Sequence, residues 1–301
     1  MVAAKNISLI GEIFIKKVLE NNIGVKDDLR KDWKKSFEFL LFHAFMRGRR
    51  DSLSIRFKDN TMRLLSDYLN QSQIKIKEDV GGLTAKIATF KEKEKLKQSN
   101  NALKIPDLFF ENFSNNKFIT CFNENENNQF LVGNDKDIIM VAEVLNMITD
   151  ERTLPAQYEL NFYNYTIECL IEGKIHEIKK TLEDVKFIGD KLSSFYIRNV
   201  VKLEGLFQLE GNIEHHLPID RWINKVCVLL KIYNESDSIE SKKNKMRDYC
   251  SNNNVNQIEF NQGAWLIGFD SFKLLFELLS KHEILVSLDL ENIEIFKYIN
   301  D

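Results

Sequence analysis

The sequence predicts a mainly α-helical protein: one helical domain of two lobes, with a small irregular or β-containing insertion. Three observations support this fold class. Only three prolines and twelve glycines interrupt 301 residues, so few positions break a helix. Apolar residues recur at helical spacing over most of the chain. Residues 71–135 lack this spacing, and we interpret them as an insertion or subdomain of unknown role.

The helical part falls into two stretches of chain. Residues 1–70 contain N-terminal helices and a basic segment, and residues 136–301 contain the remaining helices. We expect both stretches to pack as one catalytic unit, with its two lobes joined through residues 165–202. The chain has 44% hydrophobic and 29% charged residues, which is typical of a globular protein that buries a sizeable core.

Helix boundaries are predicted from apolar spacing and from the residues at each end. The first helix runs from Asp32 to about Arg47, because Gly48 can adopt a positive φ beyond its end. A second covers residues 57–69. Two short strands are expected in the insertion, at residues 118–122 and 129–132. A further helix begins at Asp137. The remaining predicted helices cover residues 157–171, 174–183, 190–202, 220–232, 241–250 and 262–280.

The cysteines and the hydropathy indicate a compartment. The four cysteines are far apart, and no two form a C-x-x-C pair. This spacing argues against a zinc site and a cysteine-ligated iron–sulfur cluster, and it fits thiols in a reducing cytoplasm. No apolar run is long enough to cross a bilayer. We therefore expect a soluble cytoplasmic protein with no membrane partner and no metal site.

The net charge of −3 conceals two basic segments. Residues 30–63 contain ten basic and four acidic residues, a local charge of +6, and residues 186–202 contain four and one, a local charge of +3. Such segments can attract phosphate without a basic overall charge. The alternative is that they are solvated helix faces, and the charge pattern alone favours this alternative.

Two short motifs lie where predicted helices begin. Residues 186–189 form a tight turn between two helices, a helix-hairpin-helix motif in which Gly189 precedes the second helix. Backbone N–H groups at such a helix start can bind a phosphate. Lys191 lies in the first turn of this helix, and Asp220 follows Pro218 at the start of another. The motifs thus place an amine and a carboxylate at two helix starts.

These motifs resemble those of the helix-hairpin-helix DNA glycosylases, the superfamily of endonuclease III and the 8-oxoguanine DNA glycosylase/lyases. Their hairpin reads approximately L-P-G-[VI]-G-x-K-x-A, and a later helix opens P-V-D. Residues 185–193 and residues 218–220 correspond to these motifs here. Phe187 replaces the first hairpin glycine, and Ser193 replaces the alanine. The lysine-to-aspartate spacing, 29 residues from 191 to 220, is longer than the family norm.

The resemblance implies a bifunctional enzyme of base excision repair. In that role Lys191 attacks the sugar C1′ and forms a Schiff base, while Asp220 stabilises the cationic sugar. The alternative role of Lys191 is a phosphate contact. At the hairpin the family has a monovalent-cation site made of carbonyl groups. The cysteine spacing argues against the branch of the superfamily that carries an iron–sulfur cluster.

Further residues are candidates for contacts with DNA and with the excised base. The candidates for phosphate binding are Arg47, Arg49, Arg50, Lys186, Gly189 and Arg198. One of the first three could instead enter the base stack, and an exposed basic helix end is the alternative for all three. The segment with Gln262, Trp265 and Phe269 resembles the late helix that walls the base pocket in the 8-oxoguanine branch. Core packing is the stronger interpretation of aromatic residues at this spacing.

The sequence therefore predicts a DNA N-glycosylase with AP (β-) lyase activity. We expect a monomer that acts on double-stranded DNA with a damaged or modified base, with an oxidised purine favoured. Three alternatives remain: a non-catalytic helix-hairpin-helix DNA-binding protein, a monofunctional glycosylase that uses Asp220 and water, and an enzyme for an unusual modified base. In the last case, residues 71–135 are where recognition of that base is expected.

Overall fold

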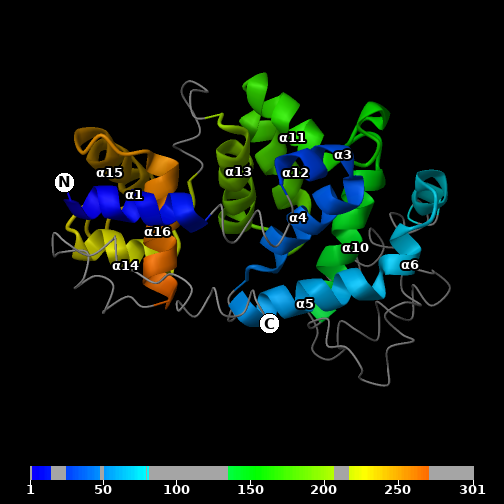
Figure 1. Cartoon of the computed structure of the whole chain (residues 1–301), viewed down its shortest axis with the longest axis horizontal. Helices are drawn as coiled ribbons and strands as arrows, with labels where there is room; N and C mark the ends of the chain where they lie inside the picture. The colour runs from blue at the N-terminus through cyan, green and yellow to red at the C-terminus, as the bar shows by residue number, and fades with distance from the viewer. Residues whose placement is uncertain are drawn as a thin grey trace, which may run out of the picture. The chain divides into compact units, whose positions relative to one another are not determined.

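The computed structural model describes residues 2–14, 25–47, 51–78, 80, 135–206 and 217–270 (Figure 1). These residues form helices, and no strand occurs among them. The prediction of a mainly α-helical protein is confirmed for this part of the chain. The two strands predicted in the insertion lie outside it, as does the last predicted helix beyond residue 270. Residues 73–78, at the start of the predicted insertion, are helical.

The helices keep the labels of Figure 1. In chain order they are α1 (Val2–Phe14), α3 (Lys26–Lys31), α4 (Trp33–Phe45), α5 (Asp51–Leu64), α6 (Ser66–Leu69), α10 (Asp135–Thr149), α11 (Phe162–Ile171), α12 (Ile175–Asp184), α13 (Asp190–Glu204), α14 (Arg221–Leu229), α15 (Ile239–Asn252) and α16 (Gln257–Asp270). A 3₁₀ helix, Ala156–Tyr158, precedes α11.

Several boundaries differ from the predicted ones because ordinary residues adopt a left-handed backbone. The helix predicted from residue 157 begins only at Phe162, since Glu159 and Leu160 have φ values of 49° and 68°. Lys231, with φ of 57°, likewise lies just beyond the early end of α14. Such conformations are uncommon in residues other than glycine. The sequence therefore carries little signal for these boundaries.

Polar side chains explain where other helices begin. The Asp32 side chain accepts a hydrogen bond from the Lys34 N–H at 2.8 Å and caps α4. The Ser238 hydroxyl accepts one from the Ser241 N–H at 3.2 Å and caps α15. Each cap satisfies an N–H group that has no partner within its own helix. The predicted start of the first long helix at Asp32 is confirmed.

The chain divides into two compact units, and neither is a continuous stretch of sequence. Unit 1 contains residues 1–28, 167–176 and 190–301, and unit 2 contains residues 29–166 and 177–189. In unit 1, α1 crosses α16 with the two backbones in contact (Figure 1). A Cβ on Gly263 would lie 1.8 Å from the Ile7 carbonyl oxygen, and one on Gly11 would lie 1.9 Å from the Glu259 carbonyl oxygen. These two glycines therefore permit the crossing.

Unit 2 contains α4, which is largely buried. The Ser36 hydroxyl accepts a hydrogen bond from the Tyr163 N–H at 2.9 Å, and the Phe39 ring packs edge-on against the Tyr163 ring at a centroid distance of 5.5 Å. Glu38 forms an ion pair with Lys58 of α5 at 2.8 Å. Apolar packing and a partly buried ion pair thus hold the neighbouring helices to α4.

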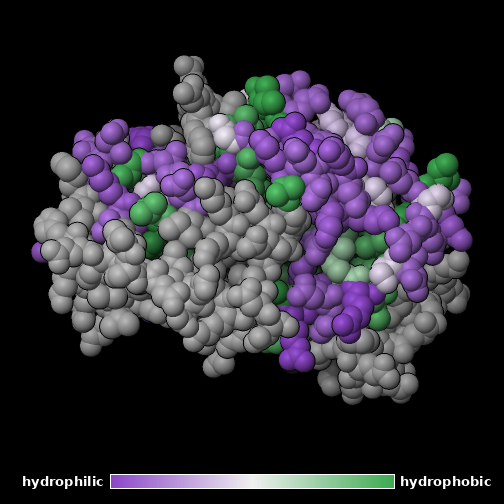
Figure 2. Space-filling view, viewed as in Figure 1, coloured by the Kyte–Doolittle hydropathy of each residue, from purple (hydrophilic) through white to green (hydrophobic). Residues whose placement is uncertain are grey.

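The surface of the described residues is largely hydrophilic, as one face shows in Figure 2. Large apolar side chains that are exposed, such as Ile74, Ile171 and Leu229, belong to separate parts of the chain. Single exposed apolar residues of this kind are normal on protein surfaces. Within the described ranges, no helix has both the length and the apolar character needed to cross a membrane.

Candidate active site

The candidate active site is formed by the starts of α13 and α14, which both belong to unit 1. Lys191 is the second residue of α13, and Asp220 is the N-cap of α14. One carboxylate oxygen, Oδ1 of Asp220, accepts hydrogen bonds from the N–H groups of Trp222 at 2.9 Å and Ile223 at 3.0 Å. These bonds fix the carboxylate at the positive end of the helix dipole, where negative charge is stabilised.

The second carboxylate oxygen is directed toward the lysine. Oδ2 of Asp220 lies 3.6 Å from Nζ of Lys191 and makes no hydrogen bond within the described part of the structure. The Asp220 side chain is only 3% exposed, whereas the Lys191 side chain is 41% exposed. The pair therefore combines a fixed, buried carboxylate with an amine that a ligand can approach from solvent.

The ring of Phe195, one turn along α13, brings two cations to this site. Nζ of Lys191 lies 5.3 Å from the ring centroid, and Cζ of Arg198 lies 4.7 Å from it. Trp265 of α16 packs edge-on against the same ring at a centroid distance of 6.0 Å. Aromatic faces attract cations through their quadrupole. Phe195 thus links the Lys191 amine to the buried core of unit 1.

Arg198 does not occupy the position that its predicted phosphate contact requires. The residue is 2% exposed, and its guanidinium donates to Oδ1 of Asn199 at 3.1 Å and to Oδ1 of Asn261 at 2.8 Å. Burial lowers the pKa of Arg198 to about 9, and the Asp220 carboxylate acts in the opposite direction. The guanidinium therefore stays charged at neutral pH, but protein groups enclose it and keep it away from a DNA backbone.

Two of the three residues predicted to line a base pocket, Gln262 and Trp265, lie in the core. Gln262 is fully buried, and its amide N–H donates to Oδ1 of Asn199 at 2.8 Å. Trp265 is 7% exposed, and the side chain of Phe269 lies outside the described residues. This arrangement matches the packing interpretation of the segment. The neighbouring Gly263 serves the crossing with α1.

The segment that follows α12 in unit 2 has a left-handed backbone at Phe187. This residue has φ of 72°, in the left-handed region that favours glycine. Its ring has three cations nearby: Cζ of Arg47 at 5.0 Å, Nζ of Lys186 at 5.4 Å and Nζ of Lys136 at 5.8 Å from the centroid. We call Phe187 and these three residues the cation cluster. Lys136, which precedes the predicted helix start at Asp137, was not among the candidate residues predicted from the sequence.

Two contacts hold the cation cluster in place. Nη1 of Arg47 pairs with the fully buried Asp137 at 3.1 Å, and the Arg47 side chain is 19% exposed. The backbone N–H of Lys186 donates to the Glu143 carboxylate. Gly189, which follows the turn, is exposed, and a Cβ there would meet no atom within 4 Å. Arg49 and Arg50 lie outside the described residues, so the contacts predicted for them stay predictions.

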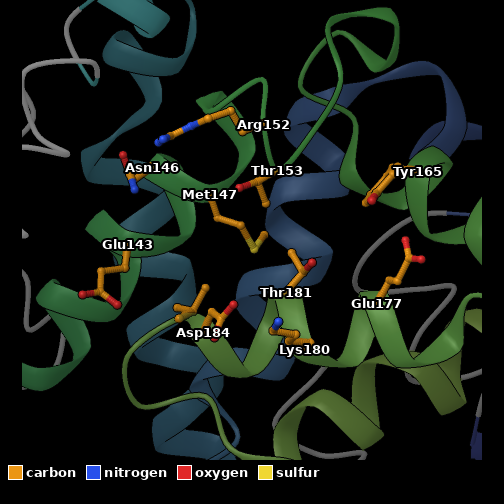
Figure 3. A pocket seen from close by; sticks show the side chains of 11 residues that line it. Glu143, Asn146, Met147, Arg152, Thr153, Tyr165, Glu177, Lys180, Thr181 and Asp184 are labelled. Atoms are coloured by element: carbon orange, nitrogen blue, oxygen red, sulfur yellow. The ribbon is translucent and has the colours of Figure 1, made fainter.

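Unit 2 also contains a cavity of about 470 Å³ that no sequence motif marks. Figure 3 shows side chains of α10, such as Asn146 and Met147, on one side and Thr181 and Asp184 of α12 on the other. The lining mixes acidic, basic and neutral polar groups, and it contains none of the predicted site residues. Within the described ranges, no three histidine, cysteine or acidic side chains gather in a way that could hold a metal ion.

Comparisons of the chain with protein-family models, with curated proteins and with solved structures return no match. The function of this chain is therefore inferred from its residues and their geometry.

Proposed function

We propose that this chain is a DNA glycosylase with AP lyase activity, of the helix-hairpin-helix kind. The observation that carries the proposal is the Lys191–Asp220 pair, in which an accessible amine lies 3.6 Å from a buried carboxylate that is fixed at a helix start. A hairpin that only binds DNA has no need of this pair. The proposed substrate is double-stranded DNA with a damaged or modified base, and an oxidised purine is favoured.

The proposed reaction assigns one role to each side chain. The neutral Lys191 amine attacks C1′ of a nucleotide drawn out of the duplex, and the bond from C1′ to the base breaks. The base departs with the bonding electron pair and takes up a proton. Asp220 stabilises the positive charge that develops on the sugar. The lysine nitrogen then loses a proton and forms a double bond to C1′ as the C1′–O4′ bond of the sugar ring breaks and O4′ takes up a proton. The resulting Schiff base permits β-elimination, in which a proton leaves C2′ and the 3′ phosphate departs, and hydrolysis of the imine then returns the free lysine.

The exposure of Lys191 supports access of a nucleotide to the amine. Its side chain is 41% exposed in the ligand-free protein. A nucleotide drawn out of the duplex can therefore reach the amine from solvent.

The cation cluster supports binding of the DNA backbone. Arg47, Lys136 and Lys186 place three positive charges around Phe187, and the turn leads through Gly189 directly into the start of α13. Positive side chains and helix N-termini both attract phosphate. A backbone contact at this turn lies within five residues of Lys191 along the chain.

Borohydride trapping tests the proposal. The protein is incubated with duplexes that carry 8-oxoguanine, uracil, thymine glycol or an abasic site, and borohydride then reduces any imine to a stable covalent adduct. We expect an adduct with wild type, none with Lys191→Ala, and strongly reduced base release with Asp220→Asn. Lys225→Ala serves as the control, because Lys225 is an exposed lysine on α14. An adduct that persists in Lys191→Ala would contradict the proposal.

A monofunctional glycosylase is the second candidate, and the fixed position of Asp220 favours it. A carboxylate held by two backbone N–H groups, with its other oxygen unbonded in the described structure, could direct a water molecule instead of the amine. Base release without an adduct would select this candidate. DNA binding with neither base release nor an adduct would leave only a binding role for the hairpin.

A further inference from the structure

A buried chain of polar side chains connects α13 and α16 with the segment before Asp220. Asn261 of α16 is fully buried, and both ends of its amide are engaged. Its Oδ1 accepts from Nη1 of Arg198 at 2.8 Å, and its Nδ2 donates to the Pro218 carbonyl at 2.9 Å. Pro218 lies two residues before Asp220. All of these residues belong to unit 1.

The Asn261 amide fits this position through its chemistry. A primary amide offers an acceptor and a donor on one short side chain, and here the acceptor receives a cation while the donor holds a backbone carbonyl. A buried polar group without a partner is strongly unfavourable. The bond to Pro218 therefore favours one position of the backbone that leads into the N-cap of α14.

Arg198 connects the same chain electrostatically to the carboxylate. It is the charged member of the network, it is 2% exposed, and it interacts with Asp220. Its second bond, from Nε to Oδ1 of Asn199 at 3.1 Å, fixes the plane of the guanidinium. Asn199 in turn accepts from the Gln262 amide at 2.8 Å. Two residues of α16, Asn261 directly and Gln262 through Asn199, thus hold a cation of α13 in the network that reaches the Pro218 carbonyl.

We propose that Asn261 and Arg198 are positioning residues for the Asp220 carboxylate, and that they act in the base-removal step. Neither residue touches the substrate in this inference. Asn261 sets the backbone position of the Pro218–Asp220 segment, and Arg198 sets the charge environment of the carboxylate. The inference rests on the proposed glycosylase function, and it adds residues that the sequence motifs do not include.

Base removal and imine formation on an abasic site are two separate chemical steps, and only the first depends on the position of Asp220. Base removal builds positive charge on the sugar and needs the Asp220 carboxylate in place. A preformed abasic site already presents an aldehyde. The Lys191 amine adds to that aldehyde and loses water to form an imine, with no bond to a base left to break. Loss of positioning should therefore slow base removal and leave imine formation on an abasic site unchanged.

The test compares these two steps in the same protein preparations. The variants are Asn261→Leu, Arg198→Met and the conservative Arg198→Lys. The control is Lys202→Met, which breaks the ion pair of Lys202 with Glu259 between the same two helices but leaves the contacts of Asn261 and Arg198. Single-turnover base release is measured on the duplex that wild type cleaves best, and borohydride trapping is measured on an abasic duplex. Thermal unfolding followed by circular dichroism reports the folded fraction.

We expect Asn261→Leu and Arg198→Met to lower the ratio of base release to trapping by roughly tenfold or more, since small misplacements of a catalytic group have effects of this size. Arg198→Lys should restore part of the ratio, and Lys202→Met should keep the wild-type ratio. Because the ratio is taken within one preparation, a smaller folded fraction cancels. A parallel loss of both steps, or an unchanged ratio, would overturn the positioning role while the proposed function stands. Wild-type protein that neither releases a base nor forms an adduct would overturn both.

Discussion

Phe187 shows how a single residue adopts the backbone conformation of glycine. A residue with a side chain loses about 1–2 kcal/mol in the left-handed region, and Phe187 has φ of 72°. The ring contacts of Arg47, Lys136 and Lys186 offset this loss, at about 0.5–1 kcal/mol for each exposed cation–π pair. The two effects are of similar size. Phenylalanine can therefore occupy a backbone position that favours glycine.

The strain at Phe187 predicts an unusual order of stability. Phe187→Ala loses the ring and keeps the strained backbone, whereas Phe187→Gly loses the ring and relieves the strain. We expect the glycine variant to be more stable than the alanine variant by about 1 kcal/mol, measured by urea unfolding. At Lys180, inside α12, the order should be reversed by a similar amount. An alanine variant at 187 that equals or exceeds the glycine variant would refute the strain.

Asp220 shows what sequence reasoning can supply at the residue scale and what it cannot. Its place at a helix start follows from the Pro218–Asp220 motif, because aspartate is a favoured N-cap. The motif also suggested the pairing with Lys191, and the structure places the two side chains 3.6 Å apart. The network through Arg198 and Asn261 was not predictable, since it depends on which faces of α13 and α16 meet. For the same reason Arg198 was expected at the surface.

At the scale of elements, helix identities were easier to predict than helix contacts. α13 and α15 lie close to their predicted ranges because apolar spacing and polar starts are local signals. α3 was not predicted, because six residues are too few to show a helical periodicity. The α1–α16 crossing was not predictable, because it depends on two glycines that are 252 residues apart, at positions 11 and 263. Only the folded chain brings them together.

The crossing predicts a sharp difference between two glycine substitutions. In Gly263→Ala the new Cβ would lie 1.8 Å from the Ile7 carbonyl oxygen, so the two backbones must separate. We expect a loss of about 1–3 kcal/mol or more in the free energy of unfolding. Gly189→Ala adds a Cβ in open space and should leave the unfolding midpoint nearly unchanged. Equal midpoints for the two variants would show that the crossing is not tight.

The Glu38–Lys58 pair between α4 and α5 predicts a pH dependence. Burial alone would raise the pKa of Glu38, but Lys58 and Lys35 outweigh it and hold this pKa below the ordinary value of 4.5. The unfolded state therefore binds a proton more readily than the folded state. The stabilisation by Glu38 is present above pH 4.5 and is lost as the pH falls through the lower folded pKa.

Substitution of Lys58 tests the direction of this pH dependence of stability. Lys58→Met removes the main counter-charge of Glu38, so the buried carboxylate is destabilised at neutral pH. In this variant, protonation of Glu38 no longer lowers the free energy of unfolding. We expect the stability difference between wild type and Lys58→Met to shrink as urea unfolding is repeated from about pH 7 down to about pH 4. Lys77→Met breaks the more exposed pair with Glu151 and should differ little from wild type at either pH. A difference that grows toward acid would contradict the assignment.

At the scale of the whole molecule, the net charge of −3 is a poor guide to function. The charges that bear on the proposal are local: the cation cluster in unit 2 and the Lys191–Asp220 pair with Arg198 in unit 1. The sequence could show these basic segments but not which of their members are buried. It also gave no sign of the polar cavity between α10 and α12, because its lining residues form no motif.

Lys191 is the proposed nucleophile, and the position of the covalent adduct in the chain shows directly whether it has this role. Wild-type protein is trapped with borohydride on the duplex that gives most adduct and on an abasic duplex, and the adduct is digested and mapped by mass spectrometry. We expect one modified peptide, with the sugar remnant on Lys191, from both duplexes. A remnant on the N-terminal amine or on another lysine, or the absence of any adduct, would contradict this expectation.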